Sequence, residues 1–338
     1  ILIKCLFFFI ISSVILTVYY LDILEIKQFL LTSSVFISLF LFSINNTFLS
    51  VFKSTNRYLL EMKIVVVDNA LSFTLVCMAL FFSEEIYLIG IALVSAKTIS
   101  CILSYYYYTQ QFTLFFVDFR KQINEIRIGF PFAIHYIVGN IFLNIDTLIL
   151  AFFVSQQDLG VYQSGIRLII GSGVLLTIVN SIYLPLLSKE AQLIDKTKEL
   201  NLYLIIIASL IAFPFLFFPE TIILLIYGSE FLSAIELFRI FGIIIFLRII
   251  GSSYGIILSI SDKQIYRALA LIISIFLICI LDFWLIPRSD NMLLTASYVL
   301  LFSHIIITGI YMLISFKRYQ TFFMPSKQLI IQKINFFK

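Results

Sequence analysis

The chain has 338 residues, of which 61% are hydrophobic and only 12% are charged, and its mean hydropathy is +1.07. Because a soluble domain carries about 25% charged residues, a soluble fold of this length is excluded. The composition predicts an all-α polytopic membrane protein.

Apolar runs close to the ~20 residues that cross a bilayer recur along the whole chain. They lack the alternation of polar and apolar residues that strands of a membrane barrel require. The ten predicted membrane helices cover residues 3–20, 29–50, 64–82, 86–108, 129–153, 160–187, 200–219, 232–260, 265–287 and 291–316.

Basic residues are distributed very unevenly over the loops of this ten-helix arrangement. One side holds 17 of the 23 Lys and Arg residues, including both ends of the chain, whereas the opposite loops hold only Lys27 and Arg288. Since basic loops stay in the cytoplasm, we expect the start and the C-terminal tail to be cytoplasmic.

The longest stretch between predicted spans, residues 109–128, is basic and amphipathic. It predicts an interfacial helix that joins two lobes. An N-terminal lobe of four helices would cover residues 1–108 and a C-terminal lobe of six helices residues 129–316, followed by a basic cytoplasmic tail at 317–338.

Residues 48–61 and 256–270 form a weak internal repeat at an offset of 209, in which Leu49-Ser50 matches Leu258-Ser259. Each segment ends a span with a short polar turn and leads directly into another span. The offset implies a six-helix repeat, so about 80 residues, two helices at ~20 residues per span plus loops, would be missing before the first span. The absence of an initial methionine fits this expectation.

Ionisable residues inside the predicted span 129–153 raise the question of function, because each costs about 2.5–3.5 kcal/mol at mid-bilayer. At 100° per residue, His135 and Asp146 share one helix face, and Asn144 lies on a second polar stripe. The pattern predicts a central helix with one side on a cavity. Arg167 in the next span is a candidate partner of Asp146, either as a structural ion pair or as a substrate contact.

The other spans contribute mainly cations. Arg248 and Lys97 lie near the middle of their spans, where each is either a cavity-lining cation or half of a buried pair. Arg239 is expected to extend to the surface and His304 to be a hydrogen-bonded packing residue. Asp68 and Asp282, nearer span ends, are expected to reach interfacial water. Arginine and lysine in a wet cavity favour an anionic cargo, particularly one with phosphate oxygens.

Motifs for other chemistries are missing from the sequence. There is no Walker A segment, no HExxH, no GxSxG and no Cys/His metal spacing, and the four cysteines lie singly in apolar runs. We therefore expect no cofactor, no metal site and no enzymatic activity. A membrane glycan polymerase or ligase stays open as an alternative, although such enzymes usually carry a large external loop.

Several short motifs resemble the Wzx-type polysaccharide flippases of the multidrug/oligosaccharidyl-lipid/polysaccharide exporter superfamily. Similar segments enter the seventh family helix, open and close the eighth, and precede the tenth. They are Gly129 and Pro131, Asn144 and Asp146, Leu159-Gly160-Val161-Tyr162, Pro185 with Ser188-Lys189, and the stretch 225–231, "LIYGSEF". By this resemblance the chain corresponds to helices three to twelve of a twelve-helix, two-lobe MATE-like fold.

The resemblance implies alternating access and a cationic cavity for an undecaprenyl-diphosphate-linked oligosaccharide, with coupling to an ion gradient or the membrane potential. Arg248, Lys97 and Arg167 would then contact substrate, and Asp146, His135 and Asn144 would serve gating or ion coupling. It also implies the bacterial inner membrane, membrane lipids as surroundings, and a polysaccharide polymerase and a chain-length regulator as partners, with no role for nucleic acid. A multidrug or cation antiporter of the same superfamily is the first alternative.

Overall fold

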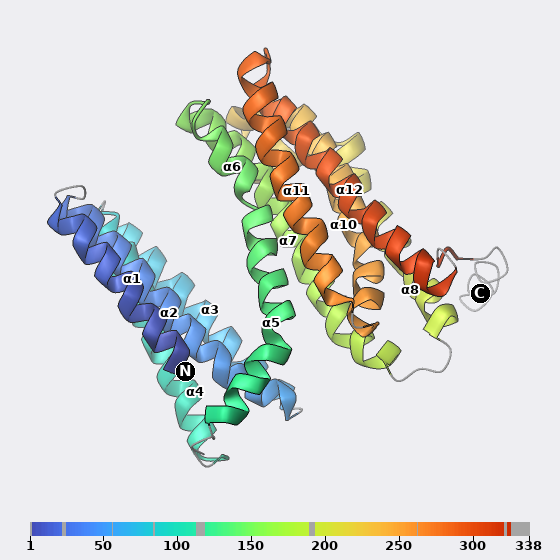
Figure 1. The fold of residues 1–338 in the computed structure, drawn as a ribbon. Coiled ribbons are helices and arrows are strands. Elements are labelled where there is room, and N and C mark those ends of the chain that lie inside the picture. The colour runs from blue at the N-terminus through green and yellow to red at the C-terminus, as the bar shows by residue number, and fades with distance from the viewer. Residues whose placement is uncertain are drawn as a thin grey trace. The chain divides into compact units, whose positions relative to one another are not determined.

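The computed structural model describes residues 2–21, 25–55, 57–83, 85–112, 119–188, 193–261, 263–320 and 323–325. Over these residues the protein is all-helical (Figure 1). Nine of the described helical segments are long and apolar enough to cross a membrane, and Lys4–Tyr20 is a shorter apolar helix. The protein is therefore an all-α polytopic membrane protein.

The chain divides into two compact units, residues 1–117 and 118–338. Unit 1 contains four helices: α1 (Leu2–Tyr20), α2 (Ile26–Ser54), α3 (Tyr58–Phe82) and α4 (Tyr87–Thr109). Helix α4 packs against α2 and α3, while α1 packs on α2. The contact of α4 with α2 is close at Gly90, where a Cβ would lie 2.0 Å from the Ser34 hydroxyl oxygen.

Unit 2 contains the remaining elements. They are α5 (Phe119–Phe142), α6 (Ile145–Leu150), α7 (Gln156–Ser188), α8 (Leu193–Phe217), α9 (Pro219–Ile226), the 3₁₀ helix η1 (Ser229–Ala234), α10 (Ile235–Ile260), α11 (Gln264–Leu285), the 3₁₀ helix η2 (Ile286–Arg288) and α12 (Met292–Tyr319). The helices lie close to the spans predicted from the apolar runs.

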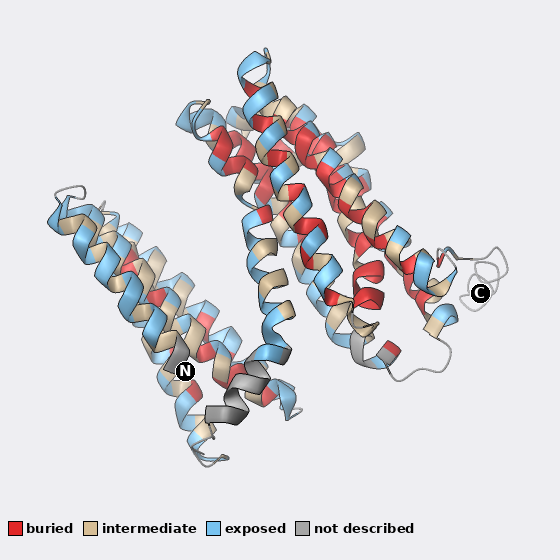
Figure 2. Cartoon of the chain, in the orientation of Figure 1, coloured by how far each residue is buried: buried red, intermediate tan, exposed pale blue. Residues whose placement is uncertain are grey.

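Helix α10 forms the centre of unit 2. It packs against α7, α8 and α12, and 15 of its 26 residues are buried (Figure 2). Its apolar residues are distributed all round the helix, as expected for a helix enclosed by others. The sequence pattern had pointed to the segment 129–153 as the central helix. The predicted contact of this segment with a cavity is confirmed. Within unit 2, α5 packs mainly on α11 and exposes large side chains such as Tyr136.

Helix α5 begins earlier than the predicted span. It starts at Phe119, so that Pro131 lies inside the helix and not in its first turn. Residues 119–128 of the predicted interfacial linker are thus helical and continuous with α5, whereas 113–118 lie outside the described residues. Lys189 and the tail after residue 325 also lie outside them.

The predicted span 129–153 is interrupted by a turn at Leu143 and Asn144, which separates α5 from α6. The side-chain amide of Asn144 donates to the Asn140 carbonyl (2.8 Å), and the backbone N–H of Asn144 donates to Ile141 (3.0 Å). A side chain that takes the i−4 carbonyl competes with the helical ladder and tightens the turn. The regular 100° rotation from His135 to Asp146 therefore does not hold.

Candidate functional site

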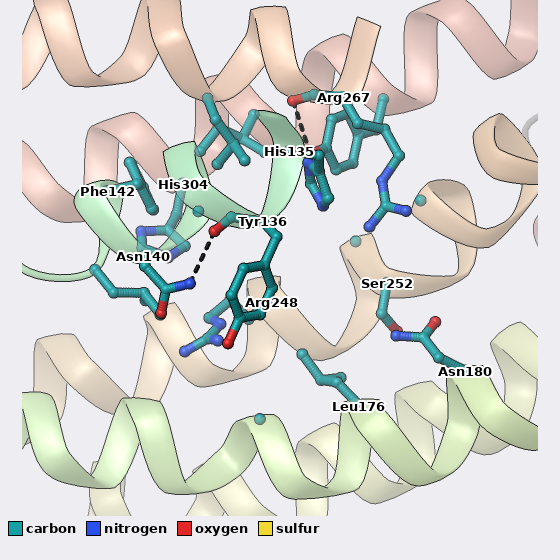
Figure 3. A pocket seen from close by; sticks show the side chains of 18 of the residues that line it. His135, Tyr136, Asn140, Phe142, Leu176, Asn180, Arg248, Ser252, Arg267 and His304 are labelled. Atoms are coloured by element: carbon teal, nitrogen blue, oxygen red, sulfur yellow. Dashed lines mark hydrogen bonds between the residues drawn. The ribbon is translucent and has the colours of Figure 1, made fainter. Parts of the chain in front are cut away.

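A cavity of about 580 Å³ lies within unit 2, between α5, α7, α10, α11 and α12 (Figure 3). We call it the unit 2 cavity. Apolar residues and backbone form much of its wall, and polar side chains project from every one of these helices. The polar lining comprises His135, Tyr136, Asn140, Thr177, Asn180, Arg248, Ser252, Arg267, His304, Thr308 and Tyr311.

Arg248 lines the unit 2 cavity from the middle of α10, as one of the two sequence-based alternatives expected. Its Nη1 donates to the Ile169 carbonyl of α7 at 2.7 Å. Its Nη2 lies 3.6 Å from the position that a Cβ of Gly173 would occupy, so the glycine leaves room for the guanidinium. Among the described residues, no ion pair involves Arg248.

Arg267 lines the same cavity from the first turn of α11 and was missed by the sequence analysis, which counted it among cytoplasmic loop residues. Its Nη1 donates to the Ser259 hydroxyl at 2.6 Å and to the Gln264 amide oxygen at 3.2 Å. These partners are neutral, so the guanidinium keeps its charge uncompensated within the described structure. The sequence did contain a sign that Arg267 lies within the membrane, because residue 267 falls inside the predicted span 265–287.

Gly255 of α10 permits this position of Arg267. A Cβ at Gly255 would lie 3.2–3.3 Å from three atoms of the guanidinium. In Figure 3 the side chains of Arg248 and Arg267 point into the cavity from two neighbouring helices. The repeat segment 256–270 contains Arg267 together with Ser259 and Gln264, the two residues to which its side chain donates hydrogen bonds.

Two histidines complete the nitrogen-rich lining. His135 reaches the cavity from α5, and its Nδ1 is buried without a hydrogen-bond partner in the described part of the chain. His304 is buried on α12, where Nδ1 lies 2.9 Å from the Leu300 carbonyl and the ring packs 5.1 Å from that of Phe142. The expectation of a hydrogen-bonded packing histidine at 304 is confirmed.

Lys97 lies in unit 1, where it forms an ion pair with Asp68 at 2.7 Å. The side chains are only 15% and 7% exposed, and the Lys97 ammonium also lies 5.2 Å from the centre of the Phe42 ring. The structure therefore shows the buried-pair alternative for Lys97. The expectation that Asp68 reaches interfacial water is wrong, since it is buried and pairs through Oδ2 with Lys97 of the neighbouring helix, while its Oδ1 has no hydrogen-bond partner among the described residues.

Asp146 does not line the unit 2 cavity, contrary to the prediction that it shares a cavity face with His135. Beyond the turn at Leu143 and Asn144 it is buried, and it accepts a hydrogen bond from the Tyr162 hydroxyl. Among the described residues no ion pair joins it to Arg167, whose side chain is exposed on α7. Asn144 is exposed as well.

The prediction that Asp282 reaches interfacial water is also wrong. It is fully buried near the C-terminal end of α11 and so does not contact solvent. Arg239, by contrast, behaves as expected for a residue near the surface, because it is half-exposed and pairs with Glu236 at 2.6 Å. In the part of the chain that the structure describes, no three His, Cys, Asp or Glu side chains gather as metal ligands.

The unit 2 cavity is chemically suited to an anion. Two guanidinium groups face it without carboxylate partners, and such groups form paired, charge-assisted hydrogen bonds with phosphate or carboxylate oxygens. Amide and hydroxyl groups of Asn180, Ser252 and Thr308 offer further hydrogen bonds to a polar ligand.

A family model described as "Polysaccharide biosynthesis protein" matches residues 1–191, which is more than half of the chain. The match includes all of unit 1 and the cavity-lining helices α5 and α7 of unit 2. Among curated proteins, none matches the chain.

Proposed function

Because the chain belongs to the polysaccharide biosynthesis protein family, we propose that it is a flippase for an undecaprenyl-diphosphate-linked oligosaccharide. It moves this lipid across the bacterial cytoplasmic membrane by alternating access, in the manner of a Wzx-type, MATE-like transporter, and serves the synthesis of a surface polysaccharide such as O-antigen. Its role is transport and not catalysis.

The observation that carries the proposal is the pair of uncompensated arginines in the unit 2 cavity, Arg248 and Arg267. A charge within a membrane lobe is costly, so cations that lack a carboxylate partner point to an anionic ligand. A diphosphate supplies two anionic groups, and the surrounding amides and hydroxyls suit sugar hydroxyls. A cationic drug would instead be repelled, which disfavours the antiporter alternative.

The other predicted site residues take secondary roles in this proposal. His135 lines the cavity and is a candidate for gating, whereas Asp146 and Asn144 lie beyond it and act in gating or ion coupling. Lys97 contacts substrate only after leaving Asp68. Arg167, exposed on α7, is a candidate for an early contact with the anionic cargo.

The proposed orientation places the basic loops and the C-terminus in the cytoplasm. The ion pair of Lys27 with Glu85 at 2.6 Å supports part of this arrangement, because it joins the first turn of α2 to the connection between α3 and α4, which ten membrane helices place on the same side. We further propose that the polysaccharide polymerase and the chain-length regulator act beside the flippase on its product.

The test is complementation of a strain that lacks the gene for this protein. We expect that strain to accumulate the lipid-linked oligosaccharide on the cytoplasmic face and to lose surface polysaccharide. The full-length protein restores the polysaccharide, whereas Arg248→Ala and Arg267→Ala reduce it at least tenfold at equal expression. Arg239→Ala is the matched control, since Arg239 lies on α10 as well but pairs with Glu236 at the surface.

Three results would overturn parts of the proposal. Normal surface polysaccharide in the deletion strain, with loss of cationic dye efflux, would favour the multidrug antiporter. Translocated but unpolymerised or unligated glycan would favour the polymerase or ligase. Full complementation by both arginine variants would remove the unit 2 cavity from the substrate path.

A further inference from the structure

Two buried aspartates of unit 2 lie outside the unit 2 cavity, and among the described residues neither forms an ion pair with a cation. Asp146 on α6 is 1% exposed and Asp282 on α11 is 0% exposed. Helix α6 packs against α11 and lies beside its C-terminal half (Figure 1), and the two carboxyl groups interact electrostatically.

The hydrogen bonds of the two carboxyl groups differ. The Tyr162 hydroxyl, itself fully buried on α7, donates to one oxygen of Asp146. Both oxygens of Asp282 are buried without a hydrogen-bond partner in the described residues, as is the second oxygen of Asp146. A buried acceptor without a donor is destabilising, and more so when it is charged.

In the part of the chain that the structure describes, no cation pairs with either carboxyl group. The ionisable side chains within electrostatic reach are Tyr162 on α7 and Cys279 on α11. Arg167 on α7 makes no ion pair with Asp146 among the described residues. Asp146 and Asp282 lie on two helices that pack together. Burial penalises the ionised form of each carboxyl group, and repulsion between like charges further penalises the state in which both are ionised.

We propose that Asp146, Asp282 and Tyr162 form a proton-binding site, in which Asp282 carries the proton and Asp146 is the carboxylate. The assignment follows from the hydrogen bonds, since a donor stabilises the ionised form and only Asp146 has one. The protonated Asp282 supplies an O–H donor to a region that otherwise contains unpaired acceptors.

Release of this proton has a mechanical consequence. It leaves two negative charges on α6 and α11, which repel each other in a region of low dielectric constant, and so favours separation of the two helices. In the proposed flippase, proton release and uptake at this site would shift the equilibrium between the two access states. Only this step rests on the proposed function. The proton site itself is independent of the cargo.

The direct test is infrared spectroscopy of the full-length protein in lipid bilayers at neutral pH. We expect a C=O stretching band of a protonated carboxylic acid, which is lost in Asp282→Asn and shifted in Tyr162→Phe. Asp158→Asn, which removes an exposed carboxylate of α7, leaves the band unchanged. Labelling of the aspartate carboxyl carbons with ¹³C shifts the band in the wild-type protein, so the assignment does not depend on a variant that folds.

Absence of the band in the wild-type protein, or its persistence in Asp282→Asn, would overturn the proposal. Loss of the band on addition of sodium at constant pH, without the same effect of potassium, would replace the proton by a metal cation and also overturn it. In proteoliposomes, Asp282→Asn should lose the acceleration of flipping by an imposed proton gradient. If the wild-type protein flips no lipid-linked sugar, the proposed function fails, while the infrared result still decides the proton site.

Discussion

Buried charged side chains are arranged differently in the two units of the protein. In unit 1 the buried cation and the buried carboxylate meet, since Lys97 pairs with Asp68 at 2.7 Å. In unit 2 they are separate: Arg248 lines the unit 2 cavity and Asp282 is buried elsewhere, and neither forms an ion pair with any residue that the structure describes. A paired charge supports its own lobe, whereas an unpaired one leaves an interaction for a ligand or a proton.

The largest expected effect breaks the pair of unit 1. Asp68→Ala leaves Lys97 buried without its partner and should lower the free energy of unfolding by about 3–5 kcal/mol. Asp282→Asn in unit 2, which replaces a protonated acid by a neutral side chain of the same shape, should change it by less than about 1 kcal/mol. Equilibrium unfolding in detergent checks both. Equal losses in the two variants would show that the units do not differ in this way.

A control separates the loss of the pair from the loss of the side chain. The double variant Asp68→Leu/Lys97→Met removes both charges and should recover most of the stability lost in Asp68→Ala, because apolar residues can replace a buried ion pair. Continued instability of the double variant would assign the effect to packing.

The next prediction compares the loss of stability caused by Gly→Ala at two close contacts between helices. Gly165→Ala in unit 2 places a Cβ 2.1 Å from the Phe241 ring, which is buried and packs edge-on against Tyr162 at 5.6 Å. Because that ring cannot move freely, we expect a loss of about 1–3 kcal/mol. Gly90→Ala in unit 1 meets the small side chain of Ser34, which can rotate, and should cost less. The ranking is read from thermal unfolding midpoints, and the reverse order would contradict it.

A smaller change in stability is expected when the cation of unit 2 is removed. Arg248→Met loses the charge-assisted hydrogen bond to the Ile169 carbonyl, worth about 1.5–3 kcal/mol, but it also removes the cost of burying the guanidinium and leaves no buried carboxylate behind. Lys97→Met should cost more, since it strands Asp68. Unfolding measurements on both variants test the order, and a larger loss for Arg248→Met would mean that Arg248 has a structural partner.

The smallest effect concerns the surface of unit 1. The ion pair of Lys27 with Glu85 has side chains that are 63% and 43% exposed, so solvent and salt screen it strongly. Glu85→Gln should leave the unfolding midpoint unchanged at physiological salt. A clear loss that disappears at high salt would show that this pair contributes more than exposed pairs usually do.

Much of the fold could be predicted because membrane helices are encoded by the length of apolar runs. The predicted span 86–108, for example, corresponds to α4 at Tyr87–Thr109. The interruption at Leu143 and Asn144 could not be predicted in this way. It contains neither proline nor glycine. Asn140 and Asn144 both donate to the carbonyl four residues earlier, yet only Asn144 lies at the interruption, so the residue types alone do not locate the turn.

The candidate site was predictable only in part, for a related reason. Arg248 and His135 were predicted to line a cavity because they lie well inside predicted membrane spans, and both line the unit 2 cavity. Pairing depends on rotation and tilt, so sequence position suggested Arg167 for Asp146 where the structure has Tyr162. Arg267 was assigned to a loop because it lies near the end of a span, although its side chain reaches inward.

The turn at Leu143 and Asn144 also affects which residues of this membrane segment can be substituted independently. It divides one membrane segment into α5, which lines the unit 2 cavity through His135, and α6, which carries Asp146. Substitutions at well-separated positions tend to act independently. Substitutions of the cavity-lining residues of α5 should therefore alter the unit 2 cavity while leaving the packing of α6 unchanged.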